Sequence, residues 1–483
     1  MIEDIRDVLE DGGEARFDVV VVGAGPAGLS VALALRGSGL KVAVLEAGGR
    51  THPGAEAQAL YEAEVTGLPY PIDASRQRFF GGTSNHWGGW CRPLDRTDFQ
   101  AREWIPMSGW PIGPDELDRW YAKAHRILEI DSSNYDPEGR VSAEHLLPVG
   151  ADSGFRNQGF RFSPPTRFAQ RYAGQLERDS ATTVLLHASV TGLNDDKGRV
   201  GSVTVSAPDG QEFTVHAGQV VLATGGLEVP RLLLHTQNGP GPALGNDSGL
   251  LGRCFMEHFG YAPGYLMTRA DLRYYRHPTE DGALMPVLAP QPELMERLQL
   301  NNVCMLLDAV QPDTSWPPEA MATPGLARGL SEPGWRYRVT LINEPSPNPE
   351  SRVELSGERD ALGLRKLRLH WAIADRDLES IERVVSELGR WLGRSGLGRL
   401  QFTRPISPET TQSFSGNLHH MGTTRMSRNP GQGVVDTDCR VFGSRNLYVA
   451  SSSVFPTCGY ANPTLTIVAL ALRLADFLRG GAS

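Results

Sequence analysis

A glycine-rich turn close to the N-terminus limits what this chain can fold into more than any other feature. The apolar residues 17–22 run directly into Gly-Ala-Gly-Pro-Ala-Gly at 23–28, followed by a segment of good helix formers and a second apolar run at 41–45. A nearly continuous apolar run predicts a parallel strand that is buried on both faces. The order strand, glycine turn, helix, strand is the context in which this glycine spacing indicates a dinucleotide-binding site.

Each glycine of the turn has a separate physical task. Gly23 permits the tight turn, Gly25 lets the backbone approach a pyrophosphate, and Gly28 lets the helix pack closely against the strand. The N-terminus of the helix offers unpaired N–H groups and the positive end of its dipole to the phosphates. Glu46 closes the second strand, where its carboxylate can accept from a ribose hydroxyl and would repel a 2′-phosphate. The motif therefore favours FAD or NAD over NADP, and it does not separate the first two.

Length and charge exclude several classes of protein. A chain of 483 residues is expected to form two or three domains. Its 47 basic and 56 acidic residues give a net charge of −9, which argues against nucleic acid as a partner because phosphate binding needs a basic face. Apolar residues make up 40% of the chain and charged residues 21%, so we expect a folded protein with a sizeable core.

Cysteines and apolar segments set expectations for the compartment. The five cysteines are scattered without a CxxC pair, so neither a disulfide framework nor a metal site is expected. The acidic N-terminus lacks the basic and apolar regions of a signal peptide. The longest apolar stretch, at 465–478, is interrupted by Arg473 and Asp476 and is shorter than the roughly 20 residues of a membrane helix. We therefore expect a cytoplasmic protein without a membrane span.

The middle of the chain predicts further strands of the same domain. A strand is expected at 182–186, and residues 200–215 read as two alternating strands that turn at Asp209 and Gly210. Another strand at 219–222 ends in Ala-Thr-Gly-Gly at 223–226, and a helix follows at 229–234. This return segment resembles that of FAD-binding domains of the glutathione-reductase type. In those domains a residue at the position of Val190 touches the adenine.

Two C-terminal motifs and one internal motif resemble a single enzyme family. Residues 416–426 read Gly-Asn-Leu-His-His-Met-Gly-Thr-Thr-Arg-Met, and residues 453–467 read Ser-Val-Phe-Pro-Thr-Cys-Gly-Tyr-Ala-Asn-Pro-Thr-Leu-Thr-Ile. Residues 79–89 read Phe-Phe-Gly-Gly-Thr-Ser-Asn-His-Trp-Gly-Gly. With the N-terminal turn, these motifs resemble the glucose–methanol–choline (GMC) oxidoreductases and are closest to the pyranose-oxidase-like branch.

The resemblance implies a fold and a cofactor. The fold class is α/β, with an FAD-binding Rossmann-like domain of the glutathione-reductase type and a second α+β substrate domain built on an antiparallel sheet. FAD is the implied cofactor. The resemblance covers the FAD-binding half of the chain well and the substrate half poorly.

The resemblance also implies a catalytic pair. His419 stands three residues before Gly422, where the family has its active-site histidine, and Asn462 matches the partner that precedes the last helix. A neutral imidazole is suited to take the proton of a hydroxyl group, and an amide can donate to the alkoxide that develops. Capping of the helix is the alternative role for Asn462. Since neighbouring side chains alternate in an extended segment, only His419 and not His420 is expected to face the flavin.

Other residues carry over as cofactor contacts. The backbone N–H groups of Thr464 and Leu465 would face the pyrimidine edge of the flavin. The glycine-rich loop would run along the isoalloxazine ring, and the residues taken from it as cofactor-binding are Gly82, Thr83, Ser84, Asn85 and His86. A covalent bond from His86 to the flavin is left open by the resemblance, although we expect FAD to be held without it.

The sequence departs from the family pattern at one place, and several other residues have no assigned role in the site. Many members carry Asp where this chain has three serines at 451–453, which puts one ribityl or phosphate contact in doubt. Glu257 and His258 are interpreted as structural residues. Aromatic side chains that could shape the pocket, although such residues more often belong to the core, are Trp87, Trp90, Trp316 and Trp371.

The domains are expected to be interleaved along the chain. The FAD-binding domain takes 15–110, 180–260 and 415–483, and the substrate domain takes 111–179 and 261–414. The substrate domain is expected to contain a helix at 115–128, antiparallel strands at 336–342, 351–355 and 366–374, and a long amphipathic helix at 375–397. The Pro-rich stretch 312–324 is expected to form a loop, either a lid or a surface excursion.

The predicted function is FAD-dependent oxidation of a CH–OH group of a sugar, a glycoside or another secondary alcohol to a carbonyl. The sugar rests on the branch resemblance alone. Oxygen or another electron acceptor would take the electrons, no nucleic acid partner is expected, and a homo-oligomer is left open. The alternatives are a GMC-type lyase with structural FAD, a dehydrogenase that passes electrons to a carrier, a non-enzymatic flavoprotein and a nicotinamide-dependent dehydrogenase.

Overall fold

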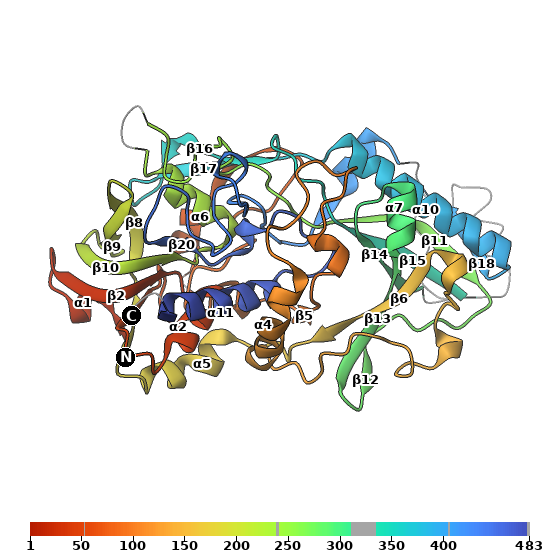
Figure 1. The fold of residues 1–483 in the computed structure, drawn as a ribbon, viewed down its shortest axis with the longest axis horizontal. Coiled ribbons are helices and arrows are strands. Elements are labelled where there is room, and N and C mark those ends of the chain that lie inside the picture. The colour runs from red at the N-terminus through yellow and green to blue at the C-terminus, as the bar shows by residue number, and fades with distance from the viewer. Residues whose placement is uncertain (53, 238–240, 311–334, 404–405, 481–483) are drawn as a thin grey trace.

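The glycine turn follows a central strand of a mostly parallel sheet in the computed structural model of the protein. The structure describes residues 1–52, 54–237, 241–310, 335–403 and 406–480. Within these residues the strands form three sheets. The first sheet lies at one end of an elongated molecule, close to both ends of the chain, and the second sheet lies at the other end (Figure 1). The Pro-rich stretch 312–324, with Trp316, falls outside the described residues.

The first sheet is built from the strands that the glycine turn and the return segment predict. Its core strands are buried on both faces, and Val19, Val20, Val21 and Val22 are at most 3% exposed. The strands next to the turn run parallel, whereas β8 (Ser189–Asp196), β9 (Arg199–Ser206) and β10 (Glu212–Leu222) form an antiparallel meander. In spatial order the strands are β1 (Ile2–Asp4), β7 (Thr182–Leu186), β3 (Val42–Leu45), β2 (Glu14–Val22), β10 (Glu212–Leu222), β9 (Arg199–Ser206) and β8 (Ser189–Asp196), and β20 (Leu447–Val449) also pairs with β10.

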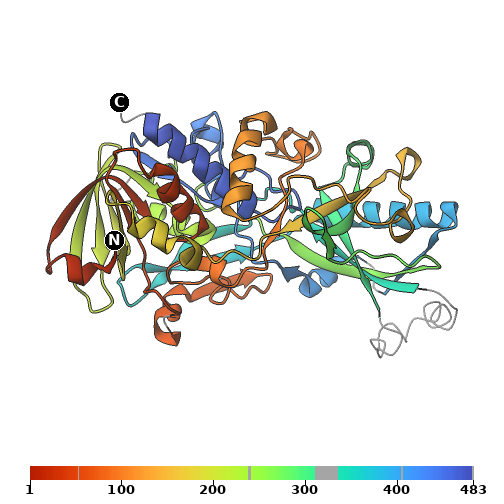
Figure 2. The ribbon, with the colours of Figure 1, turned by 90° about the horizontal axis from the view of Figure 1, so that it is seen from below.

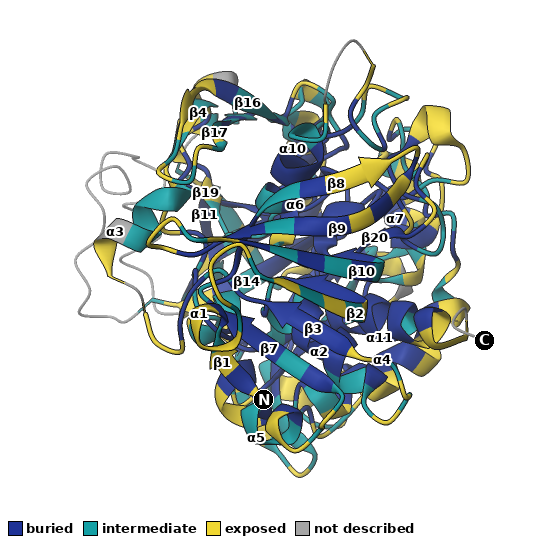
Figure 3. Cartoon of the chain, turned by 90° about the vertical axis from the view of Figure 1, so that its left-hand side faces the viewer, coloured by how far each residue is buried: buried dark blue, intermediate teal, exposed yellow. Residues whose placement is uncertain are grey.

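Helices cover this sheet and connect it to the rest of the molecule. Helix α2 (Pro26–Leu35) begins in the glycine turn and packs beside α11 (Thr464–Gly480) and α5 (Phe168–Glu177). Helix α11 packs in turn on α4 (Pro114–Ile127), and α6 (Gly225–Leu234) follows the Ala-Thr-Gly-Gly turn (Figures 1 and 3). The buried strands β2, β3 and β10 lie next to these helices (Figure 3). The fold therefore brings the head and the tail of the chain into one layer.

The second sheet forms the other half of the molecule. Helix α10 (Asp375–Ser395), predicted as an amphipathic helix, packs its apolar side on this sheet next to α7 (Pro292–Leu298) (Figures 1 and 2). All pairings in the sheet are antiparallel. In order, the strands are β18 (Gly398–Phe402), β11 (Phe259–Thr268), β15 (Trp335–Asn343), β14 (Val303–Ala309), β13 (Gly282–Pro290), β6 (Phe155–Phe162) and β5 (Trp90–Cys91), with β12 (His277–Thr279) on β13 and β19 (Ser415–Gly416) on β11.

A small third sheet differs in part from the predicted arrangement of strands. Strands β16 (Arg352–Arg359) and β17 (Arg365–Trp371) pair antiparallel with each other, as predicted, but neither pairs with β15. Instead, β17 runs parallel to β4 (Ala63–Gly67), which comes from the N-terminal part of the chain. The sequence pattern identified the strands, but a pattern of alternating residues carries no information about a partner some three hundred positions away.

Two further observations complete the fold. Among the helices in the described ranges, none is both long enough and apolar enough to cross a lipid bilayer. Two short helices, α1 (Ile5–Val8) and α3 (Ala55–Gln58), lie in the N-terminal part. The domain boundaries at residues 110, 179, 260 and 414 stay predictions.

Candidate active site

A cavity of about 600 Å³ is lined by residues from both large sheets and from the segments that follow their strands. This volume is within the usual range for cofactor and ligand sites. The predicted site residues in its wall are Gly23, Gly25, Glu46, Gly82, Thr83, Ser84, His86, Val190, His419, Asn462 and Thr464. Three others, Gly28, Asn85 and Leu465, are not among the described residues that line it. One cavity thus collects residues from the head, the middle and the tail of the chain.

The three glycines of the turn differ in what surrounds them. A Cβ built on Gly28 would lie 2.0 Å from the carbonyl oxygen of Gly23, so Gly28 serves the close packing of helix on strand. A Cβ on Gly25 would meet no protein atom within 4 Å, and Gly25 lines the cavity. Gly23 has a φ of 104°, a conformation that glycine adopts without strain. Gly25 is therefore the position at which the backbone is open to a ligand.

Glu46 is buried at the same end of the cavity. Its two carboxylate oxygens accept from the backbone N–H groups of Ala24 at 3.0 Å and Gly48 at 2.9 Å. Burial raises the pKa of Glu46. A carboxylate has about four lone-pair sites, so both oxygens can still accept from the hydroxyls of a ribose.

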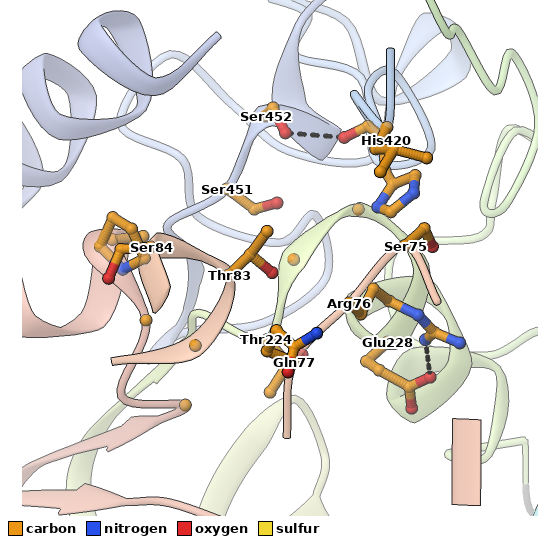
Figure 4. A pocket seen from close by; sticks show the side chains of 18 of the residues that line it. Ser75, Arg76, Gln77, Thr83, Ser84, Thr224, Glu228, His420, Ser451 and Ser452 are labelled. Atoms are coloured by element: carbon orange, nitrogen blue, oxygen red, sulfur yellow. Dashed lines mark hydrogen bonds and ion pairs between the residues drawn. The ribbon is translucent and has the colours of Figure 1, made fainter. Parts of the chain in front are cut away.

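The glycine-rich loop places some of its side chains inward and others into the cavity. Asn85 donates to the carbonyl oxygens of Phe80 and Gly82, at 3.0 and 2.9 Å, and Ser84 donates to Gly81 at 2.7 Å. These bonds close a short 3₁₀ turn at Gly82–Asn85. Thr83 was predicted, like Ser84 and Asn85, to bind the cofactor. Its side chain lines the cavity together with Thr224 and Ser451 (Figure 4). Asn85 therefore stabilises the loop, and the loop presents Thr83.

His419 and Asn462 meet at the wall of the cavity. The Nε2 atom of His419 lies 3.3 Å from the amide nitrogen of Asn462. On the other side of the ring, Nδ1 of His419 lies 2.9 Å from Nδ1 of His258, and the two rings stand at 89° to each other. His258 is fully buried, and its Nε2 lies 2.8 Å from the carbonyl oxygen of Gly459. Three side chains from distant parts of the chain thus form one hydrogen-bonded row.

Glu257 holds the backbone that carries His419. Its carboxyl group accepts from the backbone N–H groups of Asn417, at 3.1 Å, and His419, at 2.9 Å, and from the hydroxyl of Tyr70 at 2.6 Å. Leu418, between the two N–H donors, has a φ of 63°, which is uncommon for a residue other than glycine. The carboxyl group therefore fixes a strained turn directly before the histidine.

An uneven pairing explains why both adjacent histidines reach the cavity. Met256 pairs with Met421, and Phe259 pairs with Gly416, so two residues on one side face four on the other. The segment 417–420 must bulge, and a bulge redirects side chains. His419 and His420 both line the cavity, and His420 faces it in Figure 4. The expectation that only His419 faces the flavin assumed a straight strand, which the structure does not have here, and it stays a prediction.

Burial controls the charge of Glu257 and of the three histidines at 258, 419 and 420. Loss of solvation lowers the pKa of His258 to about 4 and that of His420 to about 3. Burial, with a smaller contribution from these two histidines, holds the pKa of His419 well below its usual value. Burial also raises the pKa of Glu257 to about 8, against the effect of its hydrogen bonds. At neutral pH the three imidazoles are neutral, and most of the Glu257 carboxyl is protonated.

The sequence did not reveal which residues support His419. Glu257 and His258 were interpreted as structural, and in the structure Glu257 holds the backbone of His419 while His258 contacts its ring. The adjacent acid and histidine were visible as a signal, but their partners lie far along the chain. Trp371 is buried in the core beside the second sheet and, unlike Trp87 and Trp90, is not among the described residues of the cavity wall.

Two stretches of the chain match known families. Residues 18–284 match the family described as FAD dependent oxidoreductase, which is more than half of the chain, and residues 347–471 match GMC oxidoreductase. The protein is thus an FAD-dependent oxidoreductase. Within that class it belongs to the GMC oxidoreductase family, as its motifs predicted. The assignment to the pyranose-oxidase-like branch stays a prediction.

Curated relatives are similar over nearly the whole chain. The 2-methyl-1,2-propanediol dehydrogenase of Mycolicibacterium austroafricanum is 25% identical over 95% of this chain and 95% of that protein. The paromamine 6′-oxidase of Streptomyces fradiae is 26% identical over 96% of this chain and 91% of that protein. The C-glycoside 3-oxidase of Microbacterium trichothecenolyticum is 26% identical over 95% of this chain and 96% of that protein.

Solved structures share the fold. The pyridoxine 4-oxidase from Mesorbium loti has a TM-score of 0.57 and 20% identity, covering 95% of this chain and 98% of that one. A formate oxidase has a TM-score of 0.58 and 18% identity, covering 98% and 99%. At these identities the likeness supports the architecture, an α/β FAD-binding fold with a second domain, as predicted.

The residues of the cavity fit FAD. Gly25 leaves room for a pyrophosphate at the start of α2, and Glu46 keeps free lone pairs for a ribose. Thr224 Oγ1 and His420 Nε2 are buried polar atoms in the cavity wall that have no hydrogen-bond partner within the protein. Buried polar groups are nearly always paired, so these two atoms call for a polar ligand. FAD, with its phosphates and hydroxyls, supplies such groups.

Two glycine substitutions should separate cofactor binding from folding. Gly25→Ala is expected to fold normally but retain less FAD, because its methyl group meets only cavity space. Gly28→Ala is expected to lose about 1–3 kcal/mol of stability, because its methyl group collides with the backbone of Gly23. Flavin-to-protein absorbance ratio and denaturant unfolding measure the two effects. Full FAD content in Gly25→Ala would contradict this assignment of the turn.

Glu257 should make the stability of the protein depend on pH. Its pKa rises from 4.5 to about 8 on folding, so the native state binds the proton more tightly. The contribution of Glu257 to stability is greatest below pH 4.5, falls by up to about 1.4 kcal/mol per pH unit up to pH 8, and levels off above that. Glu257→Gln keeps a neutral side chain and should lack this contribution. Denaturant unfolding at several pH values measures the difference, and parallel curves for both proteins would argue against a raised pKa.

Proposed function

We propose that this enzyme oxidises a neutral alcohol, a polyol or glycoside CH–OH group, to a carbonyl, with His419 as the base. The observation that carries the proposal is the row in which His419 Nε2 lies at the cavity wall, 3.3 Å from the amide of Asn462. A general base must reach the proton that it removes, and its pKa must leave it unprotonated. The lowered pKa of His419 meets the second requirement at neutral pH.

The chemistry divides between the cofactor and two side chains. FAD, when bound, supplies the acceptor for the hydride that leaves the substrate carbon. His419 takes the hydroxyl proton at Nε2, and Asn462 donates to the same substrate oxygen as negative charge develops on it. Both groups stand on fixed backbone, His419 on the turn held by Glu257 and Asn462 at the start of α11.

The wall contributed by the second sheet supports a neutral substrate. Its strands β5, β11, β14, β15 and β19 line the cavity with Trp90, Gly260, Leu306, Thr340, Ile342 and Ser415. None of these side chains is charged, so this part of the wall has no ion-pair partner for a cationic or anionic substrate. Hydroxyl groups on Thr340 and Ser415 can orient a hydroxylated substrate, and Trp90 and Ile342 can cover its carbon face. The diol and glycoside in the names of two relatives agree with this chemistry.

Several finer points are part of the proposal. Oxygen or a carrier takes the electrons from the cofactor, FAD is held without a covalent bond to His86, and the protein acts in the cytoplasm. The FAD-binding domain spans 15–110, 180–260 and 415–483, with 111–179 and 261–414 as the substrate domain. A homo-oligomer is compatible with this arrangement and is not required by it.

The proposed function can be tested by anaerobic reduction of the bound flavin. Neutral diols, polyols and glycosides should bleach the flavin absorbance, while matched amines and carboxylates should not. His419→Ala should slow the bleaching by about 10²-fold or more, because general base catalysis contributes about 10²–10⁴-fold. His420→Ala, with FAD content checked, serves as the neighbouring control and should change the rate far less. Unchanged bleaching in His419→Ala would reject the base, and substrate turnover with the flavin still oxidised would favour the lyase alternative.

The pH profile of flavin reduction should reveal the state of His419. Because burial lowers the pKa of His419, its basic form grows as pH rises through a value below 6.5. The rate should therefore rise with pH through one ionisation below 6.5 and stay flat from there to about pH 8. Stopped-flow reduction at saturating substrate measures the profile. A rate that continues to rise tenfold per pH unit above 6.5 would show that His419 is not the ionising base.

A further inference from the structure

We propose that His258 is a positioning residue that fixes the tautomer of His419, keeping the proton on Nδ1 of His419 and the lone pair on Nε2. The inference rests on the proposed role of His419 as the base. It adds the reason why the lone pair is on Nε2, the nitrogen next to Asn462, since a neutral imidazole can carry its proton on either nitrogen.

The contact between His258 and Gly459 determines which atom donates each hydrogen bond in the row. The carbonyl oxygen of Gly459 can only accept a hydrogen bond, so Nε2 of His258, at 2.8 Å, must carry a proton. A neutral His258 then has a bare lone pair at Nδ1. The contact of 2.9 Å between the two Nδ1 atoms needs one donor, which must be Nδ1–H of His419. Nε2 of His419 is left unprotonated, and the amide of Asn462 can donate to it at 3.3 Å.

The argument requires His258 to be neutral. His258 is fully buried, and burial lowers its pKa to about 4. A protonated His258 would donate from Nδ1 and force the opposite tautomer on His419. Because buried charges are costly without a partner, the neutral form is the one that the site holds. The nearby carboxylate of Glu344 favours the charged form only weakly, since both of its oxygens are bound by Arg102 at 2.7 and 2.8 Å.

The carbonyl group of Gly459, which accepts from His258, is itself held in place. The backbone N–H of Gly459 donates to Glu344 at 3.0 Å. Gly459 has a φ of 54°, and a Cβ there would lie 2.3 Å from a carboxylate oxygen of Asp98. The position therefore admits glycine alone in this conformation. The direction of the Gly459 carbonyl is fixed by the second half of the molecule, and it sets the direction of every hydrogen bond that follows.

His258 acts by orientation and not by carrying a proton. When His419 takes the hydroxyl proton at Nε2, its Nδ1–H remains bonded to His258. A proton passed onward would have to leave His258 through a backbone carbonyl, which is not a proton acceptor at neutral pH. The proton therefore stops at His419, and the hydride leaves the same carbon–oxygen unit for the cofactor, so that the alcohol becomes a carbonyl and the flavin is reduced.

Nitrogen NMR tests the tautomer directly. In the holoenzyme with ¹⁵N-labelled histidine at pH 7, the spectrum of His419, identified by its loss in His419→Asn, should show Nδ1 protonated and Nε2 bare. The opposite tautomer in the unaltered protein would overturn the inference. This readout needs no substitution at position 258. If it holds while His419→Ala reduces flavin normally, the proposed base fails and the tautomer inference stands.

Two substitutions at 258 provide a matched pair. In His258→Asn the side-chain oxygen can occupy the position of Nδ1 and accept from His419. In His258→Gln the amide reaches Gly459 and leaves Nδ1 of His419 without an acceptor. His258→Asn should keep the tautomer and reduce flavin at least about 10-fold faster than His258→Gln, at equal FAD content. Equal rates and equal spectra in the two variants would overturn the inference, because a purely structural role would not distinguish them.

Discussion

The pairing of residues 256–259 with residues 416–421 is the contact on which the candidate active site depends. The two sides differ in length, so the longer side bulges and cannot complete a regular ladder. Buried backbone N–H groups need partners, and Glu257 supplies them for Asn417 and His419. The same hydrogen bonds that make the bulge stable therefore also fix the backbone of His419, the proposed base. If His419 is the base, one carboxyl group serves both folding and catalysis.

Four ionisable groups at and next to His419 are mostly neutral at neutral pH. His258, His419 and His420 are neutral because burial penalises the imidazolium, and Glu257 is mostly protonated for the corresponding reason. None of these neutral groups holds a proton on His419 before substrate arrives. If His419 is the base, the imidazolium that it forms would gain little compensating charge from them, so returning the proton after each turnover would be favourable.

The head of the chain could be predicted well because its chemistry is local. Gly23, Gly25 and Glu46 act within one strand–turn–helix–strand unit, and the structure places them as the spacing predicted. His419 and Asn462 were found only through a family resemblance, since nothing near either residue reveals the other. The contacts of His258 and Glu257 with His419 could not be predicted, because strand pairing sets them. The third sheet escaped prediction for the same reason, because β4 and β17 meet across most of the chain.

One loop before α11 reaches both ends of the imidazole row. Gly459 accepts from His258, and Asn462 lies against His419, so a shift of this loop would move the first and the last contact together. The loop is tied to the second sheet by Glu344, at the end of β15, and to the first half by α11, which packs on α2. His419, the proposed base, is thus oriented by the junction of the two halves. A change that displaces one half relative to the other should disturb the tautomer of His419 before it disturbs the cofactor, whose glycine turn lies wholly within the first half.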